Sequence, residues 1–348
     1  MDKRMIKVLI VDDSLLFRET MSKGISTDLS IKVVGKAGDP YEARDKIIEL
    51  APDVLTLDVE MPKMSGIEFL KKLIPQYPIP VIVVSAVNNS VFEALNAGAV
   101  DFVAKPDVRN PDSLGKFIDE LILKIKIGSA AKAGNIRSSK SGNGLMEGRM
   151  SKSAVNVIAI GASTGGTEAI CEVVRELPGD TPGIVIVQHM PPVFTRMYAE
   201  RLDRTCRMSA REAKDGELIE KGKILVAPGD FHMKVVQGAA GGYAVRCYKG
   251  EKVNGHCPSV DVLFDSIASI SGSVSESVGI ILTGMGNDGA KGLLNMRKKG
   301  AYTIGQDENS SVVYGMPMVA QNIGAVMRQV PLGKISDILC RYVLERSK

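Results

Sequence analysis

Five polar residues in the first third of the chain have the types and spacing of a phosphoryl-transfer site. Each stands at the end of an apolar run, and they are Asp12, Asp13, Asp58, Ser85 and Lys105. Clustered carboxylates repel one another unless a cation compensates their charge. Mg²⁺, which prefers oxygen ligands, meets that need in phosphoryl chemistry. One such acid alone would be solvated or would cap a helix, whereas the complete set favours a shared site.

A second group of residues has the pattern of a serine hydrolase site. Residues 161–165, GASTG, form a G-x-S-x-G motif between the apolar run VNVIAI and the helical pattern TEAICEVVREL. In this strand–turn–helix context the turn exposes the hydroxyl of Ser163 at the positive end of the helix. Two other interpretations stay open: a phosphate-binding turn, and glycines that only permit close packing. In this turn no lysine occupies the Walker position, and the glycine spacing is not G-x-G-x-x-G, so the motif gives nucleotide binding little support.

A serine nucleophile needs a base, and the chain contains 3 histidines. His189 follows the apolar run GIVIVQ, so in a parallel sheet it would lie at the same edge as Ser163. It is therefore the preferred base, and His232 and His256 remain as binding or structural histidines.

The base in turn needs an orienting acid. Asp288 lies in the glycine-rich stretch LTGMGNDGA, although capping of the following helix is a competing role. Asp307, after the run AYTIGQ, is the rival acid. Exposed backbone N–H groups of the glycine-rich stretch could stabilise an oxyanion, an effect of about 3 kcal/mol per donor in serine hydrolases.

The elements that must position these residues follow from the hydrophobic pattern. The first 128 residues alternate amphipathic stretches with apolar runs at 7–11, 31–35, 53–57, 80–86 and 101–104. Fully apolar strands that alternate with helices indicate a parallel sheet covered on both faces. We therefore predict an α/β chain whose residues 1–128 form a doubly wound, flavodoxin-like domain.

The rest of the chain divides into a linker and a second α/β domain. Residues 129–152 are rich in Gly, Ser and basic residues, which predicts a flexible linker. Strand-like runs resume in residues 153–348, at 155–160, 183–188, 223–228, 277–284 and 301–306. Residues 231–248 alternate around a glycine-rich turn and predict an antiparallel hairpin beside a mainly parallel sheet.

Composition excludes several classes of protein. A length of 348 residues suggests about two domains, and a net charge of +4 is too small to indicate nucleic-acid binding. The 5 cysteines are odd in number and form no C-x-x-C pair, so we expect no disulfide framework or zinc site, and the cytoplasm as location. Charged residues interrupt the apolar N-terminal run, and no run reaches the ~20 apolar residues of a membrane helix.

The segments KVLIVDDS, LTLDVEMPKMSG, VVSA and KP resemble the response-regulator receiver family over residues 5–128. The resemblance implies that Asp58 accepts a phosphoryl group from a histidine kinase, which in chemotaxis is CheA. It also implies that Asp13, Asp58 and the backbone carbonyl of Glu60 hold Mg²⁺, with Asp12 acting through water.

The same resemblance implies roles for three residues outside the acid cluster. Ser85 would bond a phosphoryl oxygen, Lys105 would pair with the phosphate, and Phe102 stands at the position of the switch aromatic. Plain core packing explains Phe102 nearly as well. Ser65 replaces the Asp that is common in this family's loop after the PxM segment, and we expect no effect on the acid cluster.

The segments IGASTGGTEAI, VQHMPPVFT, PSVDVLF, LTGMGNDGA and SVVYGMP resemble the catalytic domain of the CheB family of chemotaxis protein-glutamate methylesterases. The match spans residues 154–348. It implies Ser163 as nucleophile, His189 as general base and Asp288 as orienter, with no metal. It also implies Thr164 beside the nucleophile and the Met285 backbone N–H as oxyanion donor.

The family resemblance further implies substrates and control. The substrates would be chemoreceptors, through hydrolysis of glutamyl methyl esters and deamidation of specific glutamines, and the unphosphorylated receiver would cover the catalytic cleft. Cys257 stands where an Arg is expected, and Met318-Val319 where Arg-Glu is common, which affects the substrate surface more than the triad. Residues 196–211 carry five arginines that form either a docking face for acidic receptor helices or a solvated helix face.

Two functions from other classes remain as alternatives. The first is a receiver-controlled module that binds a nucleotide without hydrolysis. The second is a transcriptional regulator. The residues after the linker argue against it, because they contain no helix-turn-helix pattern and form no basic domain.

Overall fold

The computed structural model describes residues 5–86, 90–107, 109–110, 113–131, 154–239, 241–270 and 274–346. The chain divides into two compact units, residues 1–136 and 137–348. Most of the predicted linker, residues 132–152, lies outside the described residues. Within the described ranges, no helix combines the length and apolar character needed to span a bilayer.

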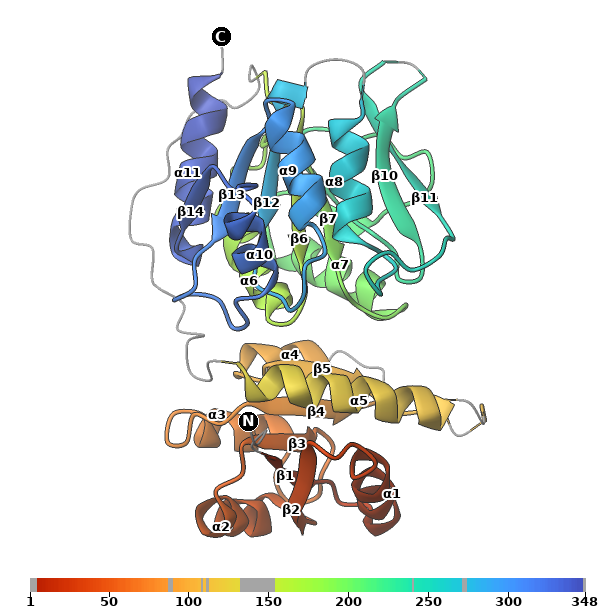
Figure 1. Ribbon diagram of the computed structural model, residues 1–348, viewed down its shortest axis with the longest axis vertical. Helices are drawn as coiled ribbons and strands as arrows, with labels where there is room; N and C mark the ends of the chain where they lie inside the picture. Colours follow the sequence, from red (N-terminus) through yellow and green to blue (C-terminus); the bar gives the residue numbers. More distant parts are fainter. Residues whose placement is uncertain are drawn as a thin grey trace. The chain divides into compact units, whose positions relative to one another are not determined.

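The N-terminal unit is built on a parallel sheet of five strands in the order β2-β1-β3-β4-β5 (Figure 1). The strands are β1 (Ile6–Val11), β2 (Ile31–Ala37), β3 (Val54–Asp58), β4 (Val81–Ser85) and β5 (Asp101–Ala104). The chain leaves β1 for β2 on one side and returns to β3 on the other. The carboxyl ends of β1 and β3 therefore flank the switch point, where ligands bind in doubly wound sheets.

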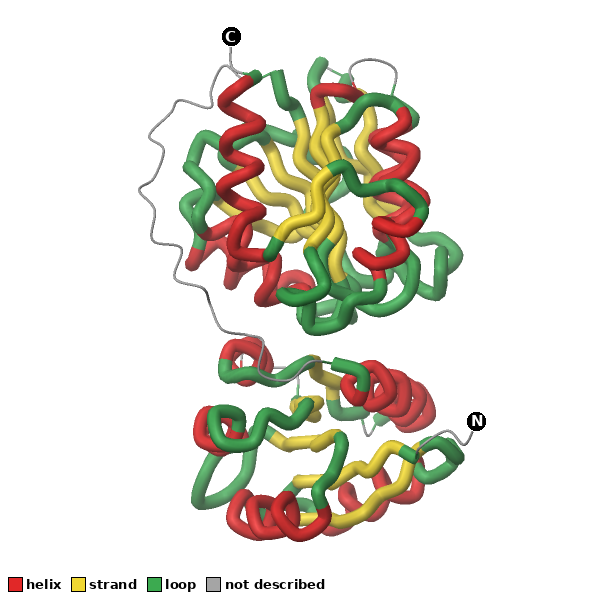
Figure 2. Tube along the Cα trace, turned by 60° about the vertical axis from the view of Figure 1, so that its left-hand side comes forward, coloured by secondary structure: helices red, strands yellow, loops and turns green. Residues whose placement is uncertain are grey.

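Five helices cover the two faces of this sheet (Figure 2). They are α1 (Leu15–Ile25), α2 (Pro40–Leu50), α3 (Gly66–Leu73), α4 (Ser90–Asn96) and α5 (Ser113–Ser129). Helix α1 packs beside α5, and α3 packs beside α2 and α4. Because both faces are covered, strand residues such as Leu9, Leu55 and Val83 are fully buried.

Ser65, the departure from the receiver pattern, has a structural role at the start of α3. Its hydroxyl accepts a hydrogen bond from the Glu68 N–H, and the Glu68 carboxylate accepts one from the Ser65 N–H. This reciprocal pair is a capping box, which satisfies two backbone donors of the first helical turn. Ser65 takes no part in the acid cluster, as expected.

The C-terminal unit contains a parallel sheet of seven strands in the order β14-β13-β12-β6-β7-β9-β8. The strands are β6 (Val157–Ala162), β7 (Gly183–Gln188), β8 (Ser209–Glu212), β9 (Lys223–Val226), β12 (Ser277–Ile281), β13 (Tyr302–Gln306) and β14 (Arg328–Val330). After β6 the chain first builds one side of the sheet, where β7, β9 and β8 follow in spatial order, and then returns to β12 on the other side. The carboxyl end of β6 is therefore a second switch point.

Helices again cover both faces of the sheet (Figure 2), and an antiparallel hairpin lies beside them and shares a buried cluster with the sheet. The helices are α6 (Gly166–Arg175), α7 (Phe194–Thr205), α8 (Val260–Ala268), α9 (Ala290–Lys298), α10 (Met316–Asn322) and α11 (Leu332–Glu345), with a short 3-10 helix, η2 (Val274–Glu276). The hairpin consists of β10 (His232–Gln237) and β11 (Tyr243–Tyr248), and β10 packs on α8. There Val235 donates its N–H to Ser266 Oγ at 2.9 Å.

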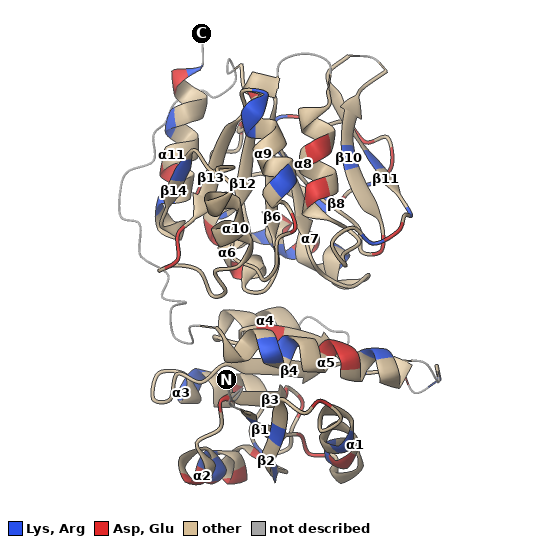
Figure 3. Cartoon of the chain, in the orientation of Figure 1, with Lys and Arg blue, Asp and Glu red and all other residues tan. Residues whose placement is uncertain are grey.

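These findings confirm the α/β prediction, including the hairpin, and correct it at the sheet margins. The sequence did not predict the edge strands β8 and β14, because both are short and mostly polar. Strand β8 also divides the arginine-rich segment 196–211, which is therefore not one helix face. Arg201 on α7 pairs with Glu168 at 2.6 Å, and Arg211 on β8 pairs with Glu217. Positively and negatively charged residues are interspersed along the chain of this unit (Figure 3).

Candidate functional site

Ser163 lies in the turn that joins the central strand β6 to α6. Its N–H donates to Thr283 O on the neighbouring chain segment at 3.0 Å, and its carbonyl accepts from Gly166 N at 2.7 Å. Gly165, with φ of 76°, makes the left-handed step that starts α6. The turn thus presents Ser163 at the positive end of a helix, as the G-x-S-x-G motif predicted.

Two glycines allow neighbouring segments to approach this turn closely. A β-carbon on Gly284 would come within 2.7 Å of Ser163 Cβ and 2.5 Å of Met316 Sδ. A β-carbon on Gly161 would come within 2.1 Å of Val260 Cγ1 at the start of α8. The packing interpretation of the motif's glycines is therefore correct for Gly161, while the same approach brings α8 to the site.

His189 lies directly beside Ser163 because β7 pairs with β6. Ala162 and Gln188, the last residues of these strands, are partners, and His189 donates its N–H to Ala162 O at 3.1 Å. The buried Gln188 amide bonds Ser163 O at 2.9 Å and His189 O at 3.2 Å. Gln188 therefore ties the two predicted reactive residues together through their backbones.

The His189 ring forms a close pair with Asp288. The distance between His189 Nε2 and Asp288 Oδ2 is 2.8 Å, and the two side chains are 7% and 1% exposed. The other ring nitrogen, Nδ1, is buried and has no hydrogen-bond partner among the described residues. The ring plane of His256 stacks on that of His189, with centroids 3.6 Å apart.

Asp288 accepts five hydrogen bonds, most of them from the start of α8. The donors are His189 Nε2, Val260 N, Ser259 Oγ, Asn254 Nδ2 and Asp261 N, at 2.7 to 3.2 Å. Burial alone would raise the pKa of Asp288, but the bonds from His189, Asn254 and Ser259 outweigh it and hold the pKa well below its usual value. This carboxylate therefore stays ionised.

The residues with alternative interpretations from sequence bond different partners in the structure. Asp288 does bind a helix N-terminus, but that of α8, while α9 begins at Ala290 with Gly289 as its N-cap. Asp307 bonds Ser310 within its own loop. His232 is buried and bonds Glu251 O and Ser259 N, which is a structural role.

Thr164 and Met285 flank Ser163 from two segments. Thr164 is buried, and its carbonyl accepts from Thr283 Oγ1 at 3.0 Å. Met285 follows Gly284, which lies against Ser163, and its side chain is 46% exposed. The Met285 N–H makes no backbone hydrogen bond within the described part of the chain.

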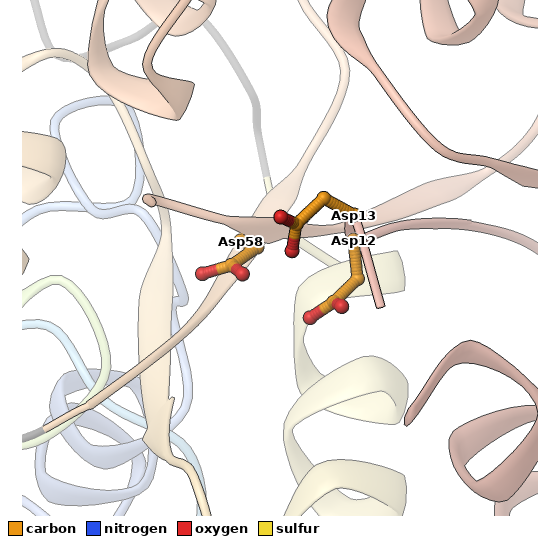
Figure 4. A group of neighbouring side chains, drawn as sticks. All are labelled: Asp12, Asp13 and Asp58. Carbon is orange, nitrogen blue, oxygen red and sulfur yellow. The ribbon is translucent and has the colours of Figure 1, made fainter. Parts of the chain in front are cut away.

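The predicted acid cluster assembles at the switch point of the N-terminal unit. Oxygen atoms of Asp12, Asp13 and Asp58 lie within 4.8 Å of one another (Figure 4). Lys105 Nζ lies 2.6 Å from Asp58 Oδ2 and 3.0 Å from Asp12 Oδ2. One ammonium group thus faces three carboxylates, an excess of negative charge that suits a divalent cation.

Burial raises the pKa of Asp58 to about 6, although the hydrogen bond from Lys105 opposes the shift. The Glu60 N–H donates to Asp58 Oδ1 at 3.2 Å. Ser85 is fully buried at the adjacent strand end, and its hydroxyl has no hydrogen-bond partner among the described residues. The structure therefore brings all of the predicted acid-cluster residues to one strand edge.

Phe102 lies on β5, three residues before Lys105, with its side chain 3% exposed. Lys124 Nζ of α5 lies 4.8 Å from the Phe102 ring centroid and 2.9 Å from Asp101 Oδ1. Lys124 could not be recognised from the sequence, because its contacts depend on how α5 packs against β5.

Comparisons with known proteins agree on both units. A family model described as CheB methylesterase matches residues 158–339, and one described as response regulator receiver domain matches residues 8–115. A relative from Syntrophomonas wolfei, named protein-glutamate methylesterase/protein-glutamine glutaminase 2, is 58% identical over 340 residues, 98% of each chain. This chain belongs to the CheB methylesterase family.

Other relatives extend the comparison. The Salmonella typhi protein named protein-glutamate methylesterase/protein-glutamine glutaminase is 45% identical over 95% of each chain. The crystal structure of the Thermotoga maritima CheB methylesterase catalytic domain aligns with a TM-score of 0.52 at 36% identity. It covers 54% of this chain and 98% of that domain.

In this CheB-family chain, sequence reasoning missed several residues that shape the site. Gln188 donates to the backbone carbonyls of Ser163 and His189. Asn254 and Ser259 donate to the Asp288 carboxylate. Polar residues next to a predicted base or at a helix start were the available signal, but helix capping explains them equally well from sequence. Cys257 directly follows His256 near this site, and Met318 lies on α10 with 41% exposure.

Replacement of Gly284 by Ala should displace Ser163, because the added β-carbon meets a rigid backbone turn. We expect labelling of Ser163 by an acylating serine reagent to slow at least about tenfold, since small displacements of a nucleophile cost that much or more. Gly115→Ala is the control, because a β-carbon there meets nothing within 4 Å. Labelling of the Gly284 variant at the wild-type rate would contradict this account of the turn.

Asp58→Asn should stabilise the metal-free protein at pH 8. Asp58 holds its proton up to about pH 6 in the folded state but releases it near 3.8 when unfolded, so its ionisation lowers stability as pH rises through this window. We expect the variant to gain on the order of 1–3 kcal/mol at pH 8, and the gain to shrink towards pH 4. Urea unfolding in EDTA measures this gain in the free energy of unfolding. Asp13→Asn is the control, and its gain should be smaller because the Asp13 carboxylate is exposed.

Proposed function

We propose that this chain is a phosphorylation-controlled hydrolase that removes methyl groups from glutamyl methyl esters of chemoreceptors and deamidates specific receptor glutamines. The observation that carries the proposal is the buried His189–Asp288 pair, 2.8 Å apart, at the strand edge where Ser163 stands. The names of the relatives from Syntrophomonas wolfei and Salmonella typhi support both reactions. Five free cysteines are consistent with action in the cytoplasm.

The hydrogen bonds of His189 define how a proton would move. Asp288 is ionised and accepts only, so the Nε2 of His189 carries the hydrogen of their bond. The lone pair for general-base catalysis is then on Nδ1, the ring nitrogen without a partner in the described residues. In the proposed reaction the Ser163 hydroxyl gives its proton to Nδ1 as its oxygen attacks the ester carbonyl.

The tetrahedral intermediate needs hydrogen-bond donors for its negative oxygen. The Met285 N–H is the proposed donor, because Gly284 brings this segment against Ser163 and no backbone carbonyl of the described residues occupies that N–H. Collapse of the intermediate expels methanol, which takes the proton from His189. Water then hydrolyses the acyl-serine by the same route, and a glutamine substrate would release ammonia instead.

The position of Asp288 explains why this pair favours catalysis. As His189 gains a proton, the positive charge lies 2.8 Å from a carboxylate that remains ionised. The start of α8 fixes that carboxylate independently of His189, so no reorganisation is needed when the charge develops. A module that only binds a nucleotide would have no use for such a pair, so we favour the hydrolase over that alternative.

In the receiver unit we propose Asp58 as phosphoacceptor, with CheA as the phosphodonor kinase. Asp13, Asp58 and the Glu60 carbonyl would hold Mg²⁺, with Asp12 acting through water, and the bound ion would neutralise the charge of the transferring phosphoryl group. The surplus of carboxylates over the one ammonium of Lys105 supports this fit. Lys105 would pair with the phosphoryl oxygens.

The buried Ser85 hydroxyl has no hydrogen-bond partner among the described residues, so it is available to bond a phosphoryl oxygen. We propose that this bond and the neighbouring Phe102 convert phosphorylation into a change of the receiver surface that relieves inhibition of the esterase.

Ser163→Ala should abolish methanol release from methylated receptor membranes, because the hydroxyl that forms the acyl intermediate is absent. Loss of the triad typically removes about 10⁶-fold of the rate in serine hydrolases. Methanol is measured directly, and the Gly115→Ala variant should retain full activity as the control. Near-wild-type release by Ser163→Ala would refute the proposed mechanism.

Asp58→Asn should leave basal esterase activity measurable but remove its stimulation by phosphorylated kinase in the presence of Mg²⁺. The amide cannot form an acyl phosphate, whereas the residues around Ser163 are unchanged. The measurement is the ratio of methanol release with and without phosphodonor. If this variant is stimulated as strongly as the wild type, Asp58 is not the phosphoacceptor.

A further inference from the structure

The turn Val253–His256 lies against the His189–Asp288 pair and has a defined geometry. Two backbone hydrogen bonds of 3.0 Å join its ends, from Val253 N to His256 O and from His256 N to Val253 O. Both central residues have positive φ, 52° at Asn254 and 85° at Gly255. This is the pattern of a type I′ turn, for which Asn-Gly is the preferred pair. The turn is therefore locally determined and stiff.

The tip of the turn is anchored to the acid of the pair. The Asn254 amide donates to Asp288 Oδ1 at 2.9 Å and to Asp261 Oδ2 at 2.7 Å. Asp261 is itself fixed by the Gly292 N–H at 2.7 Å. One side chain thus joins the turn both to α8 and to the carboxylate that binds His189.

The far end of the turn supplies a ring to the base. The imidazoles of His256 and His189 stack with centroids 3.6 Å apart and an angle of 8° between their planes. Asp288 holds His189 through one atom, Nε2, which leaves rotation about that bond open. A parallel ring on one face removes this freedom, because rotation would drive the two rings into each other.

The chemistry of His256 differs from that of a structural histidine. Both ring nitrogens of His232 are hydrogen-bonded, to Glu251 O and Ser259 N. The His256 ring makes no hydrogen bond to a described residue, and it stacks on the His189 ring. Burial, together with the neighbouring His189, lowers the pKa of His256 to about 4, so the stacked ring is neutral when His189 takes up a proton.

We propose that His256 is a positioning residue for His189, and that the turn Val253–His256 fixes the plane of the base and the place of its acid together. This inference rests on the proposed esterase function. His256 touches neither the reacting ester nor Ser163 in this scheme, and its effect passes through the orientation of Nδ1 on His189.

Two substitutions in the full chain separate positioning from a role in folding. In His256→Ala the stacking ring is lost, and we expect kcat for methanol release to fall roughly 10- to 100-fold, as for a misaligned base. KM should change little, because the substrate contacts remain. In His256→Phe a flat ring remains without nitrogen atoms, and we expect kcat within about threefold of wild type.

A spectroscopic measurement reports the same geometry without catalysis. The chain has 3 histidines, so the ring N–H of His189 that bonds Asp288 can be assigned by proton NMR. We expect this signal to be sharp in the wild type and in His256→Phe, and to broaden or disappear in His256→Ala. A residue needed only for folding would not give this difference between two folded variants.

Wild-type kcat together with an unchanged His189 signal in His256→Ala would overturn the inference. Equal loss of kcat in the Ala and Phe variants would also overturn it, because a stacking ring alone would then not suffice. Failure of the proposed function looks different: the wild type would release no Ser163-dependent methanol. In that event the NMR comparison still decides whether His256 orients His189.

Discussion

The carboxylate of Asp288, held by five hydrogen bonds, is the interaction on which the catalytic unit depends. Two of its donors are backbone N–H groups at the start of α8, which need acceptors in any case. The same carboxylate satisfies that helix and fixes His189. Helix capping and orientation of the base are therefore one structural solution, since the acid cannot move without exposing the end of α8.

The two units treat buried carboxylates in opposite ways. Around Asp288, donors exceed the negative charge, so the group stays ionised and rigid. Around Asp58, burial raises the pKa of the Asp58 carboxyl group to about 6, and the carboxylates outnumber the single ammonium group of Lys105. A fully compensated acid suits permanent orientation of a neighbour, whereas an under-compensated one suits a cation and a transferred phosphoryl group. Both arrangements lie at switch points of parallel sheets.

Much of the fold and of the chemistry could be predicted because it is local in sequence. Fully apolar strands alternate with amphipathic helices, and each predicted reactive residue lies at the end of a strand or in the loop that follows it, so parallel pairing brings these residues to one edge of each sheet. Strands β8 and β14 escaped prediction because an edge strand buries little and carries a weak apolar signal. Ser65 was correctly separated from the acid cluster, but its capping box emerged only from the structure.

The sequence by itself determined the two α/β units and the order of their motifs. It also indicated Ser163, His189 and Asp288 as the candidate catalytic residues. The sequence could not decide what Asp288 binds. Its partners are Asn254 and residues 259–261, and this segment reaches Asp288 only because Val260 packs against Gly161 and Gly289. The stack of His256 on His189 was equally undetermined. Covalent neighbours define periodicity, whereas contacts between loops depend on how completed layers pack, which only the tertiary structure decides.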